Sequence, residues 1–150
     1  MNAEKNIKKI NKDIIRSRSL KEMSNSSLKI IKLIKLNEET TTIIFREIYE
    51  GLRQNLESIG YLKGFQFRSH EAITFFLKKI LKEEKISLIF DRYRKLRNKL
   101  NYYGKPIQKE TVKEAIIEIP KIIKYLEKYR KWYIQTLQNF TKNFLLQQNV

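Results

Sequence analysis

A basic stretch in the second half of the chain combines residue types that can bind a phosphate and a base. Arg97 and Asn98 are followed, four to six residues later, by Tyr102 and Tyr103. A guanidinium can hold two phosphate oxygens at once, and a phenol can stack on a base or hydrogen-bond to a phosphate. At helical spacing these side chains gather at one helix end. The stretch is therefore the first candidate for an anion-binding site.

The charge around these residues is positive over a long run. Seven Lys/Arg residues and no acid lie between Asp91 and Glu110. The whole chain has 32 Lys+Arg against 16 Asp+Glu, a formal net charge of +16. Such an excess favours a polyanionic partner through counterion release, and a lysine-rich surface without that partner is the alternative. Further candidate nucleic-acid contacts in the run are Arg94, Lys95, Lys99 and Lys105.

The composition excludes several other kinds of chemistry. The chain has no cysteine, which excludes disulfides and thiolate zinc sites. Its single histidine, His70, excludes multi-histidine metal sites, so we expect no metal and no cofactor. His70 stands at a predicted helix start, where a lone histidine is more often structural, and the helix dipole there disfavours its protonated form. We include it among the candidate nucleic-acid contacts because its ordinary pKa lies near neutrality.

A second basic cluster, rich in aromatic residues, lies near the C-terminus. Aromatic and cationic side chains together can form a nucleic-acid platform. Aromatic residues at helical spacing also form cores and dimer contacts, so both interpretations stay open. The cluster consists of Tyr125, Tyr129, Trp132 and Tyr133 among Lys121, Lys124, Lys128, Arg130 and Lys131.

The elements that must position these residues are helices. With only four glycines and two prolines, most of the chain shows the apolar spacing of amphipathic helices. The spacing predicts helices over about 3–23, 39–58, 70–82, 86–102 and 109–146, with loops at 24–27 and 60–68. A helical segment at 28–37 can be separate from 39–58 or continuous with it. We predict one all-α domain, 1–150, built as an antiparallel bundle of four or five helices.

Local signals mark several helix ends. Ser69 is a predicted N-cap, and Gly104 followed by Pro106 ends the helix at 86–102. Pro120 is expected to kink or break the last helix. No apolar run approaches a membrane span, and the first residues lack the hydrophobic core of a signal peptide, so we expect a cytoplasmic protein without membrane contact.

The basic stretch resembles the defining motif of the HEPN superfamily (higher eukaryotes and prokaryotes nucleotide-binding). In that family an arginine, often followed by asparagine, stands four to six residues before a histidine. Arg97 and Asn98 match this start, and they precede the last long helix as in the family. Several short sequence segments also resemble those of small archaeal members, and the likeness covers about residues 10–125. These segments are 45–50 (FREIYE), 60–65 (GYLKGF), 69–72 (SHEA) and 97–104 (RNKLNYYG).

The resemblance implies a homodimeric bundle in which two motif helices form a composite cleft. In active members this cleft cuts RNA without a metal; others bind nucleic acid or nucleotides, and many pair with a nucleotidyltransferase in toxin–antitoxin modules. This chain departs at the histidine position, where Tyr102 stands. A phenol has a pKa of about 10 against about 6.5 for imidazole, so Tyr102 is a poor general base at neutral pH.

These observations predict an RNA- or nucleotide-binding module in which Arg97, Asn98 and Tyr102 line the cleft and cleavage is weak or absent. One alternative is a metal-independent, toxin-type endoribonuclease in which Arg97 stabilises the transition state. Another is a nucleotidyltransferase partner with Tyr102 or Tyr103 as nucleotide acceptor, and a third is a structural helical protein. His70 can replace the missing histidine only if the fold brings it to the cleft.

Overall fold

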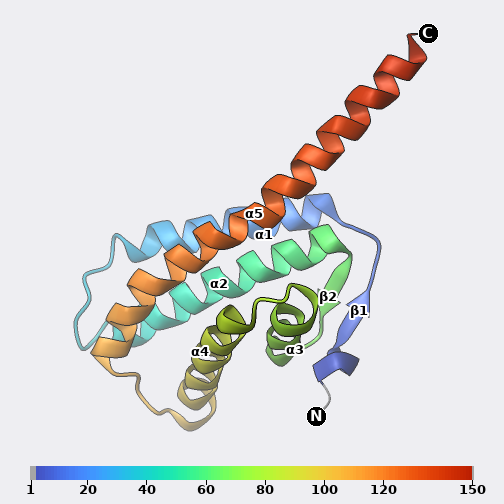
Figure 1. Cartoon of the computed structure of the whole chain (residues 1–150). Coiled ribbons are helices and arrows are strands. Elements are labelled where there is room, and N and C mark those ends of the chain that lie inside the picture. Colours follow the sequence, from blue (N-terminus) through green and yellow to red (C-terminus); the bar gives the residue numbers. More distant parts are fainter. Residues whose placement is uncertain (1–2, 150) are drawn as a thin grey trace.

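The computed structural model describes residues 3–149, and these form a bundle of helices with a small sheet at one end (Figure 1). The helices are α1 (Ile14–Ile31), α2 (Thr41–Lys63), α3 (His70–Phe75), α4 (Glu84–Tyr103) and α5 (Lys109–Gln148). A π-helical turn, η2 (Phe76–Ile80), continues α3. A 3-10 turn, η1 (Ala3–Asn6), precedes β1 (Ile7–Lys9), which pairs antiparallel with β2 (Phe65–Phe67). The prediction of a mainly helical chain is confirmed.

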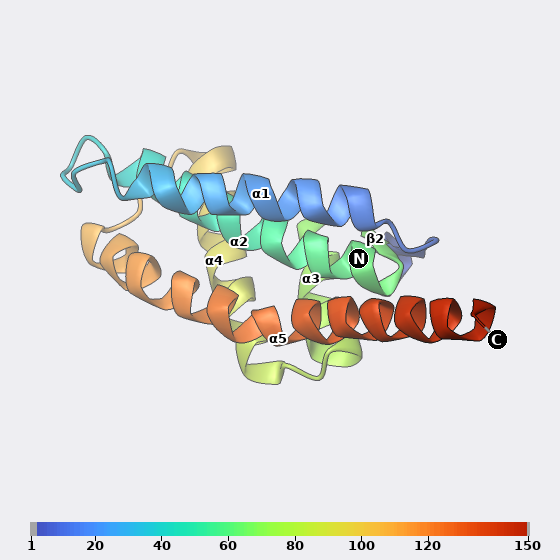
Figure 2. The same ribbon diagram turned by 90° about the horizontal axis from the view of Figure 1, so that it is seen from above.

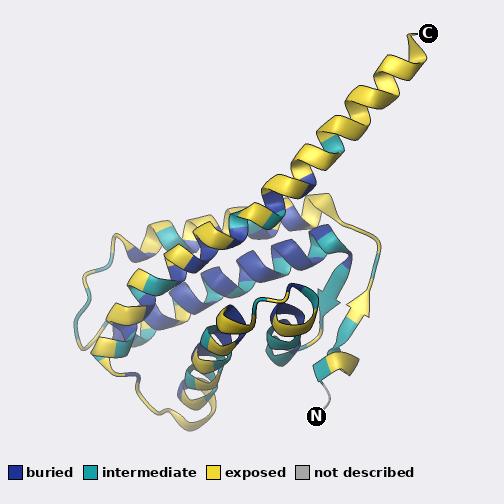
Figure 3. Cartoon of the chain, in the orientation of Figure 1, coloured by how far each residue is buried: buried dark blue, intermediate teal, exposed yellow. Residues whose placement is uncertain are grey.

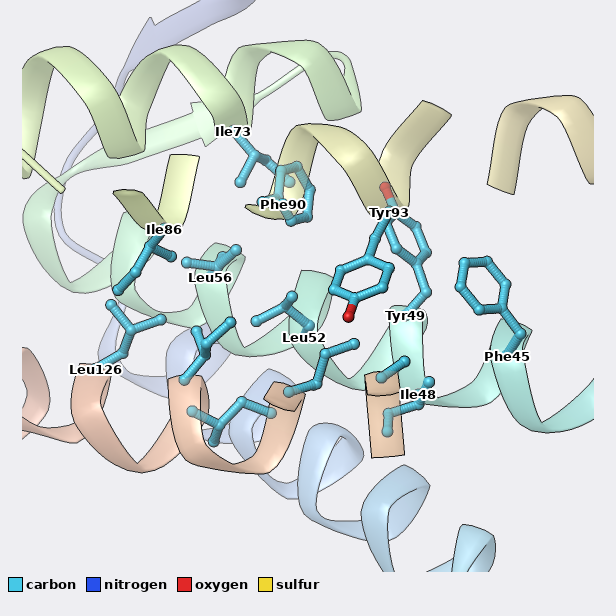
Figure 4. Packing of buried hydrophobic residues seen from close by; sticks show 14 of the residues in the cluster. Phe45, Ile48, Tyr49, Leu52, Leu56, Ile73, Ile86, Phe90, Tyr93 and Leu126 are labelled. Carbon is cyan, nitrogen blue, oxygen red and sulfur yellow. The ribbon is translucent and has the colours of Figure 1, made fainter. Parts of the chain in front are cut away.

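α2 is the central helix of the bundle. Its apolar residues recur every three or four positions and are buried, because α1, α4 and α5 pack around it. Seen from above, α1 and α5 lie on two sides of α2 (Figure 2). The buried stripe of α2 is continuous in Figure 3, and Figure 4 shows Tyr49, Phe90 and Tyr93 between α2 and α4. α2 and α4 therefore hold each other in register through aromatic rings.

The predicted loop at 24–27 is wrong, because these residues lie inside α1. Ser24 and Ser27 do not end the helix, since their small side chains are buried against α2, as is that of Ser17 earlier in α1. Ser24 donates to the Gly51 carbonyl at 2.6 Å, and Ser17 donates to the Ser58 carbonyl at 2.7 Å. A Cβ added at Gly51 would lie 3.4 Å from the Ser27 side chain, so the two helices approach closely.

The predicted helix over about 3–23 is also wrong in its first half, because residues 3–6 form only a 3-10 turn and 7–13 are not helical. Asp13 caps α1 by accepting from the Arg16 amide at 2.8 Å, and the preceding residues 7–9 pair with β2. The strand forms because it pairs with β2, which lies nearly sixty residues later in the chain. Helical periodicity cannot reveal a pairing between such distant segments.

Residues 28–58 do not form one continuous helix, because an irregular segment separates α1 from α2. α1 ends at Ile31 and α2 begins at Thr41, so 28–37 is mostly not helical. The Asn37 side chain accepts from the amides of Glu39 and Thr40, which forms a turn in place of a helix. α2 then continues past the predicted end at 58 and stops at Gly64, whose φ of +83° is left-handed.

The second half of the chain follows the predictions more closely. Ser69 caps α3 by accepting from the Ala72 amide, and Gly104 ends α4 with a φ of +60°. α5 is continuous through Pro120, so the predicted break does not occur. Pro120 is exposed, which leaves water free to satisfy the carbonyl that lacks its helical donor. Beyond Tyr133, α5 projects away from the bundle (Figure 1). Within 3–149, no helix combines the length and apolar character needed to span a membrane.

Candidate phosphate-binding site

The buried phenol of Tyr49 links two residues that are far apart in the sequence. Its hydroxyl lies 2.8 Å from Nδ1 of His70, at the start of α3. Its ring stacks on Phe90 at 5.7 Å, and the guanidinium carbon of Arg97 lies 6.0 Å from the ring centroid. Burial raises the pKa of Tyr49, so the phenol keeps its proton. The fold therefore brings His70 and Arg97 to the same side chain.

Two further charged residues of α2 complete this arrangement. Arg53 donates from Nε to Glu50 at 2.9 Å and from Nη1 to Glu57 at 2.6 Å. Burial alone would raise the pKa of Glu50, but the hydrogen bond and charge of Arg53 outweigh it and lower that pKa. We name Tyr49, Glu50, Arg53, His70 and Arg97 the His70–Arg97 cluster.

The pKa of His70 shows which sign of charge dominates in this cluster. Burial and then the charges of Arg53 and Arg97 lower the pKa of His70 from 6.5 to about 4, against the opposing effect of Glu50. The imidazole is therefore neutral at pH 7. Positive charge outweighs negative charge at this point of the molecule, which is the condition for binding an anion.

Three cations of α4 are already paired with acids. Arg94 and Lys95 both contact Asp91, at 2.7 and 2.9 Å, and Arg92 contacts Glu114 at 3.0 Å. These pairs neutralise part of the predicted basic run.

Arg97 differs from those cations. Within residues 3–149 no carboxylate lies at salt-bridge distance from it. It is half-buried, and its one side-chain hydrogen bond in that range is a long one, 3.4 Å, to the amide oxygen of Asn98. On α2, Arg46 is similar: it donates to Asn101 at 3.2 Å and forms no ion pair in the described chain. Arg97 therefore has guanidinium donors available for a ligand.

The remaining predicted site residues lie at the exposed end of α4. Tyr102 and Tyr103 are 74% and 76% exposed, and neither phenol hydrogen-bonds to a residue of the described range. Lys99 and Lys105 are exposed as well. The structure thus brings Arg97 and His70 to the ring of Tyr49, with Asn98 beside Arg97. Among residues 3–149, no side-chain hydrogen bond joins Tyr102 to them.

Sequence reasoning missed the contribution of α2. Arg46, Tyr49, Glu50 and Arg53 recur at helical spacing, and this pattern was visible in the chain. None of the four was singled out as a site residue, because periodicity cannot show which neighbour a helix faces. Only the pairing of α2 with α4 turns this pattern into part of a site.

Searches of protein-family models, of curated proteins and of solved structures find no match to this chain. The function must therefore be argued from the cluster itself.

Proposed function

We propose that this chain is an RNA- or nucleotide-binding module of HEPN type, in which Arg97 contacts a phosphate beside His70. The observation that carries the proposal is the state of Arg97. It is half-buried over the Tyr49 ring and has no acid at salt-bridge distance among residues 3–149, whereas Arg53, Arg92 and Arg94 are each paired. An arginine held in this way can form two parallel hydrogen bonds to a phosphate without first breaking an ion pair.

The electrostatic surroundings support an anionic ligand. The lowered pKa of His70 arises partly from the nearby charges of Arg53 and Arg97, so a phosphate at this point would relieve repulsion between like charges. The chain's formal net charge of +16 adds long-range attraction for a polyanion.

The same groups favour binding over cutting. An imidazole with a pKa of about 4 is a weak base and is almost never protonated at pH 7, so it cannot supply a proton to a leaving oxygen. Tyr102, at the family's histidine position, is exposed and forms no side-chain hydrogen bond to Arg97 or His70 among the described residues. Cleavage of RNA is therefore weak or absent in this proposal.

We also propose that the module acts as a homodimer with a composite cleft. Ile43 is 56% exposed and Tyr102 is 74% exposed, and they flank in sequence the pair Arg46–Asn101 that joins α2 to α4. A second copy placed over this end would cover both apolar side chains and bring two Arg97 residues to one nucleic-acid strand. The mass in solution tests this point, and Ile43→Asp should reduce it to that of one chain.

A second candidate function rests on the exposure of Tyr102 and Tyr103. Phenols more than 70% exposed at a helix end are accessible acceptors for a nucleotidyltransferase partner. A nucleotide mass added to either tyrosine after incubation with that enzyme and its nucleoside triphosphate would favour this function.

The main proposal is tested by titrating labelled single-stranded RNA with the purified chain in EDTA and measuring fluorescence anisotropy. We expect salt-sensitive binding of intact RNA, and Arg97→Ala should weaken it. Arg92→Ala is the matched control, because it removes one positive charge from the same helix at a residue already paired with Glu114. Equal losses in the two variants, or no binding, would contradict the proposal. RNA cut in EDTA by the wild type but not by Arg97→Ala would favour the endoribonuclease.

A further inference from the structure

One face of α5 carries exposed aromatic rings and lysines that the His70–Arg97 cluster does not use. Residues 121, 125, 128, 129 and 132 fall on one side of the helix at its period of 3.6. Tyr125 is 49% exposed and Trp132 is 63% exposed. Tyr133 and Arg130 point the other way and are buried. The aromatic cluster noted in the sequence is thus part core and part surface. We name Lys63, Lys121, Tyr125, Lys128, Tyr129 and Trp132 the α5 platform.

Lysines from two helices approach these rings. Nζ of Lys128 lies 4.0 Å from the centroid of Tyr125, and Nζ of Lys63, at the end of α2, lies 5.6 Å from Tyr129 and 5.8 Å from Trp132. Aromatic faces and ammonium groups therefore alternate along about three turns of α5. This combination can hold bases by stacking and phosphates by charge.

A carboxylate orders part of the platform. Glu83, before α4, accepts from the hydroxyl of Tyr129 at 2.5 Å and from the hydroxyl of Tyr125 at 3.2 Å, and it lies 3.1 Å from Nζ of Lys128. Burial would raise the pKa of Glu83, but the hydrogen bonds from Tyr129 and Lys128 lower it further than burial raises it. The acid is therefore ionised and engaged by three donors, which hold the rings in place.

A hollow of about 440 Å³ opens beside Tyr125. Its floor is apolar, formed by Ile86, Ile89 and Ile122, and Lys85 and Lys121 stand at its rim. Two acids also line it: Glu83, engaged as above, and Glu118, which accepts from the Tyr93 hydroxyl at 2.5 Å. A hollow of this size and polarity suits a planar ring with an attached anionic group.

We propose that the α5 platform binds a short stretch of single-stranded nucleic acid. One base stacks on Trp132, and another enters the hollow beside Tyr125, while Lys63 and Lys121 neutralise the phosphates between them. Lys128 is paired with Glu83 and positions the ring of Tyr125. Tyr125 and Trp132 are seven residues apart, about 10 Å along the helix, which corresponds to about three stacked bases. A duplex would keep its base faces covered and could not use the rings.

The platform is separate from the His70–Arg97 cluster. Glu83 and Arg97 are fourteen residues apart on the α4 segment, which places them about 20 Å from each other by helical rise. The proposal therefore does not depend on phosphate binding at Arg97.

The fluorescence of Trp132 tests this proposal directly, because it is the only tryptophan in the chain. We would titrate the full chain with an octamer of uridylate and with an octamer of thymidylate, and follow both emission and the anisotropy of the labelled strand. Base stacking predicts quenching of the emission, and a duplex of the same length should not quench it. Arg97→Ala should leave the quenching unchanged, which separates this proposal from the main one.

Two variants sharpen the experiment. Trp132→Ala should weaken octamer binding by about tenfold, while Trp132→Phe keeps a stacking face and should weaken it less. Trp132 is exposed, so neither change removes core packing. Binding by anisotropy without any change in Trp132 emission would overturn the proposal. A change in emission that follows protein concentration without nucleic acid would identify the platform as a contact between copies and would overturn it as well.

Discussion

The His70–Arg97 cluster and the α5 platform, the two regions proposed to bind anions, are built in different ways. In the cluster, side chains from three helices meet around the buried ring of Tyr49, and Arg97 lies half-buried beside that ring. On the platform, lysines surround exposed rings that come mainly from one helix. A planar guanidinium favours one phosphate geometry, whereas lysines and stacking faces accept many sequences. We therefore expect the two regions to differ in selectivity.

The largest expected effect concerns the packing that only the cluster has. Tyr49→Ala should lower the free energy of unfolding by about 3–5 kcal/mol, because it removes a buried ring stacked on Phe90. Tyr125→Ala on the platform should cost less than about 1 kcal/mol, since that ring is 49% exposed. Urea unfolding measures both values. Tyr49→Phe is the control that keeps the ring and loses only the bond to His70. Equal costs at the two sites would mean that the regions do not differ in this way.

A second difference is the response to pH. Because the pKa of His70 is about 4 in the folded chain and about 6.5 when unfolded, the unfolded chain binds the extra proton first as the pH falls. The stabilisation from the neutral imidazole is thus present above pH 6.5 and is lost as the pH falls toward about 4, by up to about 3 kcal/mol.

The urea midpoint at several pH values between 4.5 and 7 checks this effect, and His70→Gln should flatten the curve in that window. The carboxyl groups with lowered pKa values are those of Glu50, Asp91 and Glu83. The stability that they contribute is lost only as the pH falls through the ordinary pKa of a carboxyl group and below it, so they do not obscure the effect of His70. An unchanged slope in His70→Gln would show that the imidazole is not held neutral by its surroundings.

The third comparison is between the two kinds of cation. Arg97→Ala should weaken binding of a long single-stranded RNA by about tenfold or more, because it removes a fixed two-bond phosphate contact. Lys121→Ala on the platform should weaken it only a few-fold and lower the dependence of affinity on salt by about one charge, because Lys121 is exposed. Anisotropy titrations at several salt concentrations measure both. If Lys121→Ala costs more than Arg97→Ala, the platform is the principal site and the cluster is not.

The smallest effect is expected at the exposed tyrosines of α4. Tyr102→Phe and Tyr103→Phe should change RNA affinity by less than about twofold, because neither hydroxyl has a partner among the described residues and each ring remains able to stack. The same anisotropy titrations apply. A loss above fivefold in Tyr102→Phe would show that its hydroxyl contacts the ligand.

Local chemistry in the sequence was enough to locate some elements and not others. Ser69 and Gly104 mark helix ends because capping depends on residues close in the chain, and both were predicted. The serines of α1 were interpreted as a loop because their partners, such as the Gly51 carbonyl, belong to another helix. The strand at 7–9 has the same explanation, since its partner is β2.

The residues of the candidate site also differ in whether local sequence signals or contacts between helices identify them. Charge and spacing pointed to Arg97 and Asn98, and the structure places Arg97 near His70, with Asn98 beside Arg97. Tyr49 and Arg53 were missed because their role depends on the packing of α2 against α4. Tyr102 was expected in the cleft from a family resemblance, and its place beside the ligand remains a proposal about a dimer.

The central claim, that a phosphate binds at Arg97 beside His70, is tested most directly by the pKa of that imidazole. His70 is the only histidine in the chain, so one proton resonance in a pH titration by nuclear magnetic resonance reports on it alone. We predict a pKa of about 4 in the free protein and a higher value with saturating RNA, because the phosphate stabilises the imidazolium. In Arg97→Ala the free value should rise and the response to RNA should disappear. A pKa near 6.5 in the free protein, or one unchanged by bound RNA, would contradict the claim.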